Sequence, residues 1–350
     1  MPTLRIAVAG AGLIGLAHIA ALRSNPDCAL HAIVDPASAA AAIARSEGVS
    51  HYTELAELLA GDRPDGIILA TPNALHLEQG LACMEAGIPT LLEKPITQTV
   101  AQAEQLVAAV ERSGAKMLIG HHRAHSPIMD KARAVVDSGV LGRLVAVTGS
   151  ATFYKPDHYF AQAPWRSAPG GGPILINMIH EVHNLRMLCG EITAVQAFAS
   201  RAVRGFPVED TVAVNLRFAS GCLGSFMLSD TAASARSWEQ TSQENPSYPS
   251  YDDEDCYALS GTNGTLAIPT MRLKTYPRVE DRSWWKPFET GRVGMLRADP
   301  LARQIAHFCA LIRGQTQPLV SARDGLANLR VTEAIAAAAS SGATVDIPPS

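Results

Sequence analysis

The chain has 350 residues, of which 47% are hydrophobic and 18% are charged. This composition predicts a soluble protein with a well-buried core and excludes a disordered chain, and the length favours two domains. The formal net charge of -4 and the scattered lysines and arginines give no reason to expect nucleic acid or a membrane surface as a partner.

The six cysteines predict reduced, buried thiols in a cytoplasmic protein, because most lie in apolar segments and none forms a CxxC pair. The apolar run after Arg5 superficially resembles a signal peptide. Three glycines interrupt this run and no clear cleavage region follows, so we interpret it as a strand and a turn. No segment is long and apolar enough to span a bilayer.

The first predicted elements are a strand, a glycine-rich turn and a helix. Residues 4–9 form a continuous apolar run, as expected for a parallel strand that is covered on both faces. The sequence Gly10-Ala11-Gly12-Leu13-Ile14-Gly15 follows directly. In this pattern the first glycine permits a tight turn, the second lets the backbone approach a pyrophosphate, and the third lets helix and strand pack closely.

A second predicted strand, residues 29–35, ends in Asp35, twenty residues after Gly15. A carboxylate at this spacing can accept hydrogen bonds from the 2′-hydroxyl of a ribose and would repel a 2′-phosphate, which favours NAD over NADP. Free amides at the helix start, including those of Leu13 and Ile14, can bind the phosphate charge. The alternative is a chance glycine loop, which the flanking strands and the spaced acid disfavour.

Strands and helices continue to alternate up to about residue 120, which predicts a doubly wound parallel sheet. Thr71, Pro72, Asn73 and His76 lie at the carboxyl end of one strand, where ligands bind in such sheets. Contact with the cofactor and simple helix capping by Asn73 are both consistent with this position. The expected elements are a helix at 53–60, strands at 66–71, 88–92 and 115–120, and helices to about 86 and at 99–113.

The tripeptide Glu93-Lys94-Pro95 follows the strand at 88–92. The proline disfavours the α region for Lys94, so the lysine should lie on extended backbone just beyond the strand end. This position would bring Lys94 to a cofactor cleft. Taken alone, the tripeptide is also consistent with an ordinary surface turn.

Residues 121–125 mark the exit from the first domain and contain three histidines. We expect no metal site there, because no CxxC pair or carboxylate cluster accompanies them and adjacent histidines rarely converge on one ion. The composition then changes. Residues 144–154 alternate in polarity, which indicates an antiparallel sheet with one open face.

A polar and aromatic loop at 155–172 leads into a predicted helix at 173–189. An apolar stripe at helical spacing marks the buried side of this helix. Asn177, His180 and Asn184 fall on the opposite side, and His183 flanks them. We expect that side to face a cleft, because a solvent-facing side would more often carry lysine and glutamate.

The remaining sequence predicts strands followed by two closing helices. The segment 237–255 is too long for a simple connection, which leaves an active-site lid, an interface arm or a mobile loop as alternatives. The strands are expected at 194–203, 211–218, 223–229, 257–260 and 265–268, and the helices at 301–312 and 326–340.

In this order, these motifs resemble those of the Gfo/Idh/MocA oxidoreductase family over nearly the whole chain. The resemblance rests on the glycine loop with His18, Thr71-Pro72-Asn73 with His76, Glu93-Lys94-Pro95, Gly170-Gly171-Gly172 with His180, Glu209-Asp210-Thr211 and Gly261-Thr262-Asn263-Gly264. It implies an α/β protein with a doubly wound Rossmann domain at 1–122 and a substrate-binding and oligomerisation domain at 123–350. The second domain would be α+β with an open, mostly antiparallel sheet. An open sheet needs covering, so we expect a homodimer or homotetramer.

The family resemblance also implies roles for individual residues. Lys94 matches the catalytic lysine and His180 the histidine usually taken as the general base. The family commonly has Asp or Asn four residues before that histidine and often Asp three residues after it, where this chain has Ile176 and His183. Asn177 could substitute for the first, because residues three apart share a helix face. These departures lie where substrate contacts are expected.

We therefore expect an NAD-dependent dehydrogenase that transfers a hydride reversibly between nicotinamide and a secondary alcohol of a sugar, inositol or similar cyclic polyol. The residues expected to bind the cofactor are Gly10, Gly12, Leu13, Ile14, Gly15, Asp35, Thr71, Pro72, Asn73, His76, Glu93 and Lys94. Those expected to contact the small-molecule substrate are Lys94, His122, Tyr154, Trp165, Arg166, Asn177, His180 and His183.

Two alternatives remain at this point. A carboxylated cyclic substrate, such as a cis-dihydrodiol or a sugar acid, is suggested by Lys155, His158, Trp165 and Arg166, because arginine binds carboxylates bidentately. The other alternative is a non-catalytic, nucleotide-sensing regulator on the same fold, since fold does not fix function. Such a regulator has no need for Lys94 together with His180.

Overall fold

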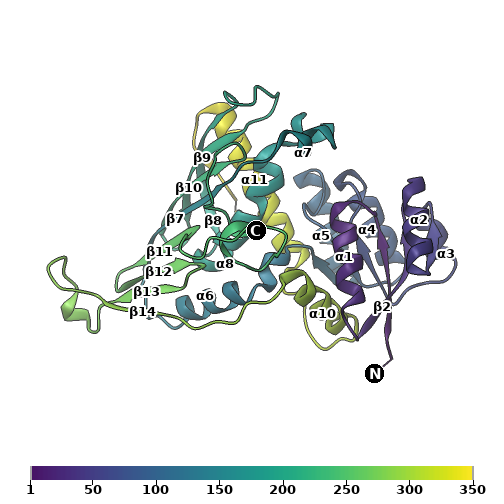
Figure 1. Ribbon diagram of the computed structural model, residues 1–350, viewed down its shortest axis with the longest axis horizontal. Coiled ribbons are helices and arrows are strands. Elements are labelled where there is room, and N and C mark those ends of the chain that lie inside the picture. The colour runs from purple at the N-terminus through teal and green to yellow at the C-terminus, as the bar shows by residue number, and fades with distance from the viewer. Residues whose placement is uncertain (1, 349–350) are drawn as a thin grey trace. The chain divides into compact units, whose positions relative to one another are not determined.

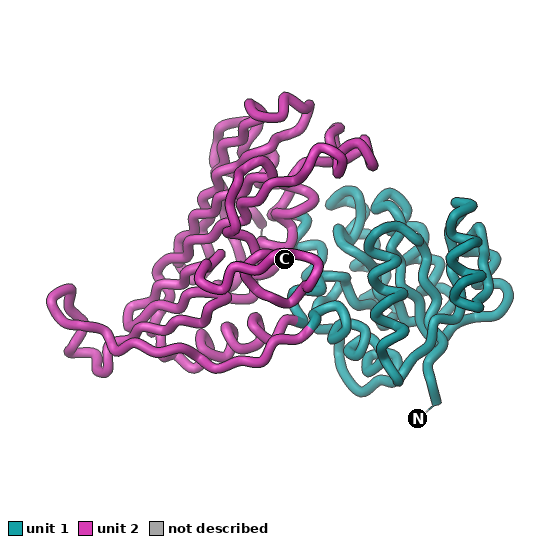
Figure 2. The backbone as a smooth tube through the Cα atoms, viewed as in Figure 1, with its two compact units in different colours: residues 1–125, 299–329 teal, residues 126–298, 330–350 magenta. Residues whose placement is uncertain are grey.

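The computed structural model describes residues 2–348, whose backbone divides into two compact units (Figure 2). Unit 1 contains the residues up to 125 together with 299–329, and unit 2 contains 126–298 and the residues from 330 onward. The expected boundary between 122 and 123 had placed 299–329 in the C-terminal domain. The structure groups these residues with unit 1, because α10 (Pro300–Ile312) packs against α1 (Leu13–Arg23) and the 3-10 helix η2 (His122–His125).

Unit 1 is built on a six-stranded parallel sheet with the order β3-β2-β1-β4-β5-β6. Strands β4, β5 and β6 are completely buried, as their apolar sequences predict for a sheet covered on both faces. The strands are β1 (Leu4–Ala9), β2 (Cys28–Val34), β3 (Ser50–Tyr52), β4 (Gly66–Leu69), β5 (Thr90–Leu92) and β6 (Met117–Ile119). Besides α1 and α10, the helices are α2 (Ser38–Glu47), α3 (Leu55–Ala60), η1 (Asn73–Leu75), α4 (His76–Glu85) and α5 (Val100–Ser113).

Unit 2 is built on a nine-stranded sheet that is antiparallel except where β7 and β10 pair in parallel. Its order is β14-β13-β12-β11-β7-β10-β9-β8-β15. The strands are β7 (Leu144–Thr152), β8 (Ile192–Ser200), β9 (Thr211–Phe218), β10 (Leu223–Ser229), β11 (Tyr257–Gly261), β12 (Gly264–Ile268), β13 (Arg272–Thr275), β14 (Glu289–Arg292) and β15 (Val345–Asp346).

Helices α6 (Pro127–Asp137), α8 (Ile179–Cys189) and the C-terminal part of α11 (Ala322–Ser341) pack against one face of this sheet (Figure 1). The opposite face carries exposed apolar side chains, among them Phe198, which is 79% exposed. The open sheet that the alternating sequence of β7 predicts is therefore confirmed. The shorter helices are α7 (Asp157–Ala161), η3 (Pro164–Ser167), η4 (Ile174–Met178), α9 (Trp238–Thr241) and η5 (Val279–Asp281).

The structure differs from the sequence-based expectation in the helix predicted at 173–189. Residues 174–178 form a π-helical turn, and the regular α-helix begins at Ile179. The helix also lacks an open polar side, because almost every residue of α8 is buried, including His180, His183 and Asn184. The expectation of a polar face along an open cleft was therefore wrong for α8 as a whole, and the prediction that Asn177 shares an α-helical face with His180 does not hold across the π turn.

Other segments agree with or extend the expectations. Trp238, at the start of the long segment 237–255, is 2% exposed and belongs to the core of unit 2. The six cysteines are buried free thiols. Among residues 2–348, none of the helices combines the length and apolar composition needed to cross a membrane.

Candidate functional site

The glycine loop joins β1 to α1 through a turn that the glycines make possible. Gly10 has a φ of +89°, a backbone conformation that side chains rarely adopt, and a Cβ there would lie 2.4 Å from the carbonyl oxygen of Ala70. A Cβ on Gly15 would lie 1.9 Å from the carbonyl oxygen of Gly10. The surroundings of Gly12 are open. The loop is therefore closed against the sheet on one side and accessible on the other.

The N-terminus of α1 is suited to an anion. Gly12 is its N-cap, no side chain caps the helix, and the first turn contains no acidic residue. Leu13, the first helical residue, is 79% exposed. Unsatisfied backbone amides and the positive end of the helix dipole thus face an accessible surface, which is the arrangement that binds phosphate groups.

Asp35 follows β2 and lies beside this loop. Its Oδ2 accepts a hydrogen bond from the amide of Ala11 at 2.8 Å, and its Oδ1 accepts one from the amide of Ala37 at 2.8 Å. Each carboxylate oxygen has two acceptor sites, so one remains on each oxygen for a ribose hydroxyl. The two backbone donors fix the carboxylate at the edge of the glycine loop. These residues fit the adenosine half of a dinucleotide.

The neighbouring strand end holds Thr71 and His76. Thr71 donates a hydrogen bond from its hydroxyl to Gln79, and the His76 ring lies between the carbonyl oxygens of Thr71, at 2.9 Å, and Pro95, at 2.8 Å. Burial lowers the pKa of His76, although both carbonyls and Glu93 oppose this effect. Asn73 begins η1 and caps neither helix, since the N-caps of η1 and α4 are Pro72 and Leu75.

Glu93 and Lys94 follow β5, as the sequence predicts. Glu93 is 4% exposed, and its Oε1 lies 2.8 Å from Nε2 of His18. Burial alone would raise the pKa of the Glu93 carboxyl. The hydrogen bond from His18, followed by the charges of His18, Lys94 and His122, outweighs burial and holds that pKa below its usual range. Glu93 is therefore an ionised carboxylate inside unit 1.

Lys94 follows Glu93 in the sequence, and the Glu93 carboxylate affects the pKa of its ammonium group. Burial lowers the pKa of Lys94, Glu93 opposes that effect, and the charge of Arg123 adds to it. Lysine pKa values shift readily on burial, which is one reason why lysines serve in catalysis.

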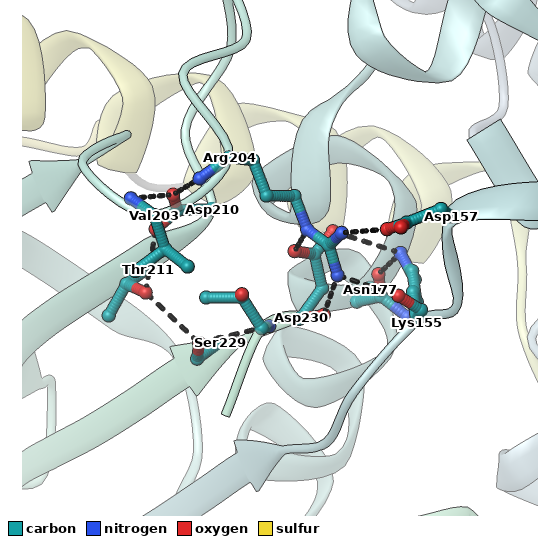
Figure 3. Close-up of polar contacts among 10 residues, drawn as sticks. Lys155, Asp157, Asn177, Val203, Arg204, Asp210, Thr211, Ser229 and Asp230 are labelled. Carbon is teal, nitrogen blue, oxygen red and sulfur yellow. Dashed lines mark hydrogen bonds and ion pairs between the residues drawn. The ribbon is translucent and has the colours of Figure 1, made fainter. Parts of the chain in front are cut away.

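In unit 2, a buried ionic network surrounds Asp230, just beyond the end of β10 (Figure 3). Its Oδ1 accepts a hydrogen bond from Nε of Arg204 at 2.9 Å, and its Oδ2 lies 3.6 Å from Nζ of Lys155. Nζ of Lys155 also donates to Oδ1 of Asn177 at 2.7 Å. Because an ammonium can only donate, this bond fixes which end of the Asn177 amide faces Lys155.

The predicted base His180 lies in α8, three residues after Asn177 and beyond the π turn. Two neighbouring positions along this helix are tied into the core of unit 2. Asn184 donates from Nδ2 to the hydroxyl of Tyr257 at 3.1 Å, and that hydroxyl hydrogen-bonds to the carboxylate of Glu181. The helix that carries His180 and His183 is therefore held by buried polar contacts as well as by apolar packing.

The loop before α8 carries several of the remaining predicted substrate contacts. The guanidinium of Arg166 lies 3.8 Å from the centre of the Tyr159 ring, and its Nη1 donates to the Tyr159 carbonyl. Trp165 and Tyr154 are each 56% exposed. In unit 1, His122 begins η2 and is partly buried.

The sequence did not single out two residues that complete these arrangements. The sequence presents His18 only as part of a motif, yet its side chain is fully buried against Glu93. No local pattern indicates Asp230, because an acid at the end of a β-strand is usually solvated. The role of His18 could have been inferred from its position on the buried side of α1, since a buried histidine needs a polar partner.

The fold and these sites define a dinucleotide-binding oxidoreductase. Residues 4–121 match the model described as "Oxidoreductase family, NAD-binding Rossmann fold", and residues 129–267 match the "GFO/IDH/MocA C-terminal domain". The chain therefore belongs to the Gfo/Idh/MocA family of oxidoreductases, and its N-terminal part is an NAD-binding Rossmann domain.

Individual relatives cover nearly the whole chain. A 1,5-anhydro-D-fructose reductase of Ensifer adhaerens is 27% identical in an alignment 347 residues long that covers 96% of this chain and 98% of that protein. An inositol 2-dehydrogenase of Rhizobium meliloti is 26% identical in an alignment 340 residues long that covers 95% of this chain and 96% of that protein. The WlbA dehydrogenase from Bordetella pertussis, solved with NADH and UDP-GlcNAcA, has a TM-score of 0.79 and 23% identity over 100% of both chains and thus shares the fold.

Proposed function

We propose that this protein is an NAD-dependent dehydrogenase that acts reversibly on a secondary alcohol of a sugar, an inositol or a similar cyclic polyol. The family and the sugar and inositol enzymes among its relatives support this substrate class. The observation that carries the proposal is Lys94, a lysine of lowered pKa placed directly after a buried, ionised carboxylate at the carboxyl end of a Rossmann strand.

NAD supplies the hydride acceptor when it is bound. The open backbone of Gly12 and the amides of Leu13, Ile14 and Gly15 would hold the pyrophosphate, and Asp35 would hold the adenosine ribose. Asp35 favours NAD over NADP because its carboxylate would repel a 2′-phosphate. The remaining cofactor contacts that we propose are Thr71, Pro72, Asn73, His76, Glu93 and Lys94.

Lys94 as a cation would stabilise the negative charge that develops on the substrate oxygen, and this electrostatic effect is largest in a dry site. His180 would accept the proton of the substrate hydroxyl as general base. Asn177 would contribute its amide, with Oδ1 already engaged by Lys155. The other substrate contacts that we propose are His122, Tyr154, Trp165, Arg166 and His183.

We further propose that the protein forms a homodimer or a homotetramer. The exposed apolar side chains on the open face of the sheet in unit 2 support this, because such a face is usually covered in solution. Phe198 is the most exposed of them.

A screen of the purified protein with NAD and with NADP tests the reaction class. We expect formation of NADH, measured by absorbance, from at least one sugar, inositol or related cyclic polyol. Rates with NADP should be lower, because Asp35 disfavours a 2′-phosphate. Tight binding of NAD without NADH formation across sugars, inositols, hydroxy acids and diols would contradict the proposed dehydrogenase function.

A carboxylated cyclic substrate is the second candidate, and Arg166 is the residue that favours it. Nε of Arg166 is buried and has no hydrogen-bond partner among the residues that the structure describes. A guanidinium with an unused donor can bind a carboxylate. Lys155, which lies 5.0 Å from the centre of the same Tyr159 ring, adds a second positive charge on this loop.

Replacing Arg166 with alanine separates the two substrate classes. If the substrate is carboxylated, kcat/KM for sugar acids and dihydrodiol carboxylates should fall at least about tenfold more than kcat/KM for neutral polyols, because only the acids lose a charge-assisted hydrogen bond. Steady-state kinetics on matched acid and alcohol pairs, such as a hexuronate and its hexose, measure this difference. Equal losses on both members of a pair would count against the carboxylate.

A further inference from the structure

His18 is a buried polar residue for which the proposed reaction gives no role. It lies in the second turn of α1, on the side that faces the sheet, and its side chain is 0% exposed. Its Nε2 lies 2.8 Å from Oε1 of Glu93, whose side chain is 5% exposed. The helix that begins at the glycine loop is thereby joined to the segment that carries Lys94.

The chemistry of the two groups fixes the direction of this hydrogen bond. An ionised carboxylate can only accept, so Nε2 of His18 carries the proton and donates it. Nδ1 of His18 is buried and has no hydrogen-bond partner within residues 2–348. The hydrogen bond to Glu93 therefore fixes the orientation of the His18 ring.

The second oxygen of Glu93 faces the next residue. Oε2 accepts a hydrogen bond from the backbone amide of Lys94 at 3.2 Å. A Cβ at position 120 would lie 2.7 Å from Oε1 of Glu93, so only glycine leaves room for the carboxylate there. On the other side of the turn, His76 lies 2.8 Å from the carbonyl oxygen of Pro95. The turn at 93–95 is therefore held by two buried histidines from two different helices.

We propose that His18 is a positioning residue, which holds the Glu93 carboxylate beside Lys94 and so couples the glycine-loop helix to the catalytic lysine. The inference rests on the proposed catalytic role of Lys94. His18 itself touches neither substrate nor the reacting atoms in this scheme.

The charges around Glu93 show how His18 would act on Lys94. Glu93 faces His18 on α1, His122 on η2 and the adjacent Lys94, and Lys94 is also affected by Arg123 on η2. Without the donor on His18, burial would favour the protonated form of Glu93. Lys94 would then lose the charge of Glu93, which raises its pKa, and that pKa would fall further.

The test compares two amides at position 18. His18→Gln places an amide nitrogen where Nε2 lies, whereas His18→Asn is shorter by one methylene and cannot reach Glu93 from the same backbone. The pKa of Lys94 would be measured in the full-length protein saturated with NAD, by competitive acetylation at a series of pH values and mass spectrometry. We expect the Gln variant to resemble the wild type and the Asn variant to show a pKa lower by about one unit, a tenfold change in the protonation equilibrium.

A double substitution shows whether the effect passes through Glu93. Glu93→Gln should lower the pKa of Lys94 by itself. Adding His18→Asn should change that pKa no further, because His18 acts on Lys94 only through Glu93. Equal Lys94 pKa values in the wild type and the Asn variant would overturn the proposal. If the Asn variant does not fold, a Lys94 pKa that is unchanged by Glu93→Gln would overturn it as well.

Acetylation reports on Lys94 without any substrate, so this outcome is separate from that of the proposed function. A lowered pKa in the Asn variant combined with no turnover of any alcohol by the wild type would support the role of His18 and refute the dehydrogenase. For an active enzyme, kcat offers a second measurement. The alkaline limb of its pH profile should move to lower pH in the Asn variant, since the cationic form of Lys94 is the active one.

Discussion

Replacing Lys94 with alanine should lower kcat by about 10²- to 10³-fold and lower the affinity for NAD by a much smaller factor, because Lys94 is only one of the proposed cofactor contacts. The loss corresponds to the removal of one preorganised group that stabilises developing negative charge. The adenosine half of the cofactor depends on the glycine loop and Asp35, which the substitution does not touch. Stopped-flow or steady-state kinetics measure the first effect, and fluorescence titration with NADH measures the second.

The pH dependence of the wild-type enzyme follows from the same residue. Because burial lowers the pKa of Lys94, its cation is lost at a lower pH than for an exposed lysine. Below that pKa the side chain is charged and active, so kcat for alcohol oxidation should fall as the pH rises through it. This alkaline limb should be absent from the residual activity of Lys94→Ala.

Lys131 provides the matched control, because it is an exposed lysine on α6 in unit 2. Lys131→Ala should retain the wild-type kcat. If Lys94→Ala also retained a near wild-type kcat, the catalytic assignment of Lys94 would be wrong. A loss of NAD affinity as large as the loss of kcat would instead indicate that Lys94 serves mainly the cofactor.

Local sequence patterns predicted the features that depend on a few adjacent residues. The glycine loop, Asp35 and Lys94 could be placed because strand ends, tight turns and the residue before a proline restrict the backbone directly. Strands β1, β9 and β10 have the bounds expected from their apolar patterns. In each of these elements, burial of alternate or successive side chains leaves a periodic signal.

Features that depend on distant residues were not predicted. The hairpin of β13 and β14 lacks an apolar pattern because β14 is fully exposed. The π turn at 174–178 has the composition of an ordinary helix, so the sequence does not reveal it. The amide of Ile174, its first residue, donates to the Glu209 carboxylate, 35 residues away in the sequence. Likewise, the assignment of α10 to unit 1 follows from its packing on α1, which no local pattern reports.

The network around Asp230 is another such feature, and it leads to the largest expected effect on stability. Asp230→Ala should destabilise unit 2 by about 3–5 kcal/mol, because it leaves the buried charges of Arg204 and Lys155 without their carboxylate. The side chains of Arg204 and Lys155 are only 6% and 11% exposed, so water cannot replace the lost partner. Urea denaturation followed by circular dichroism measures the change in the free energy of unfolding.

Asp157 is the matched control, because its Oδ1 lies 3.6 Å from Nη1 of the same Arg204 while its side chain is 95% exposed. Such a surface pair contributes about 0–1 kcal/mol, so Asp157→Ala should unfold at nearly the wild-type urea concentration. Similar decreases in the free energy of unfolding of the Asp157 and Asp230 variants would show that burial does not control the energetics of this network. Adding Lys155→Met to Asp230→Ala should recover part of the lost stability, since it removes one of the two buried charges that have lost Asp230.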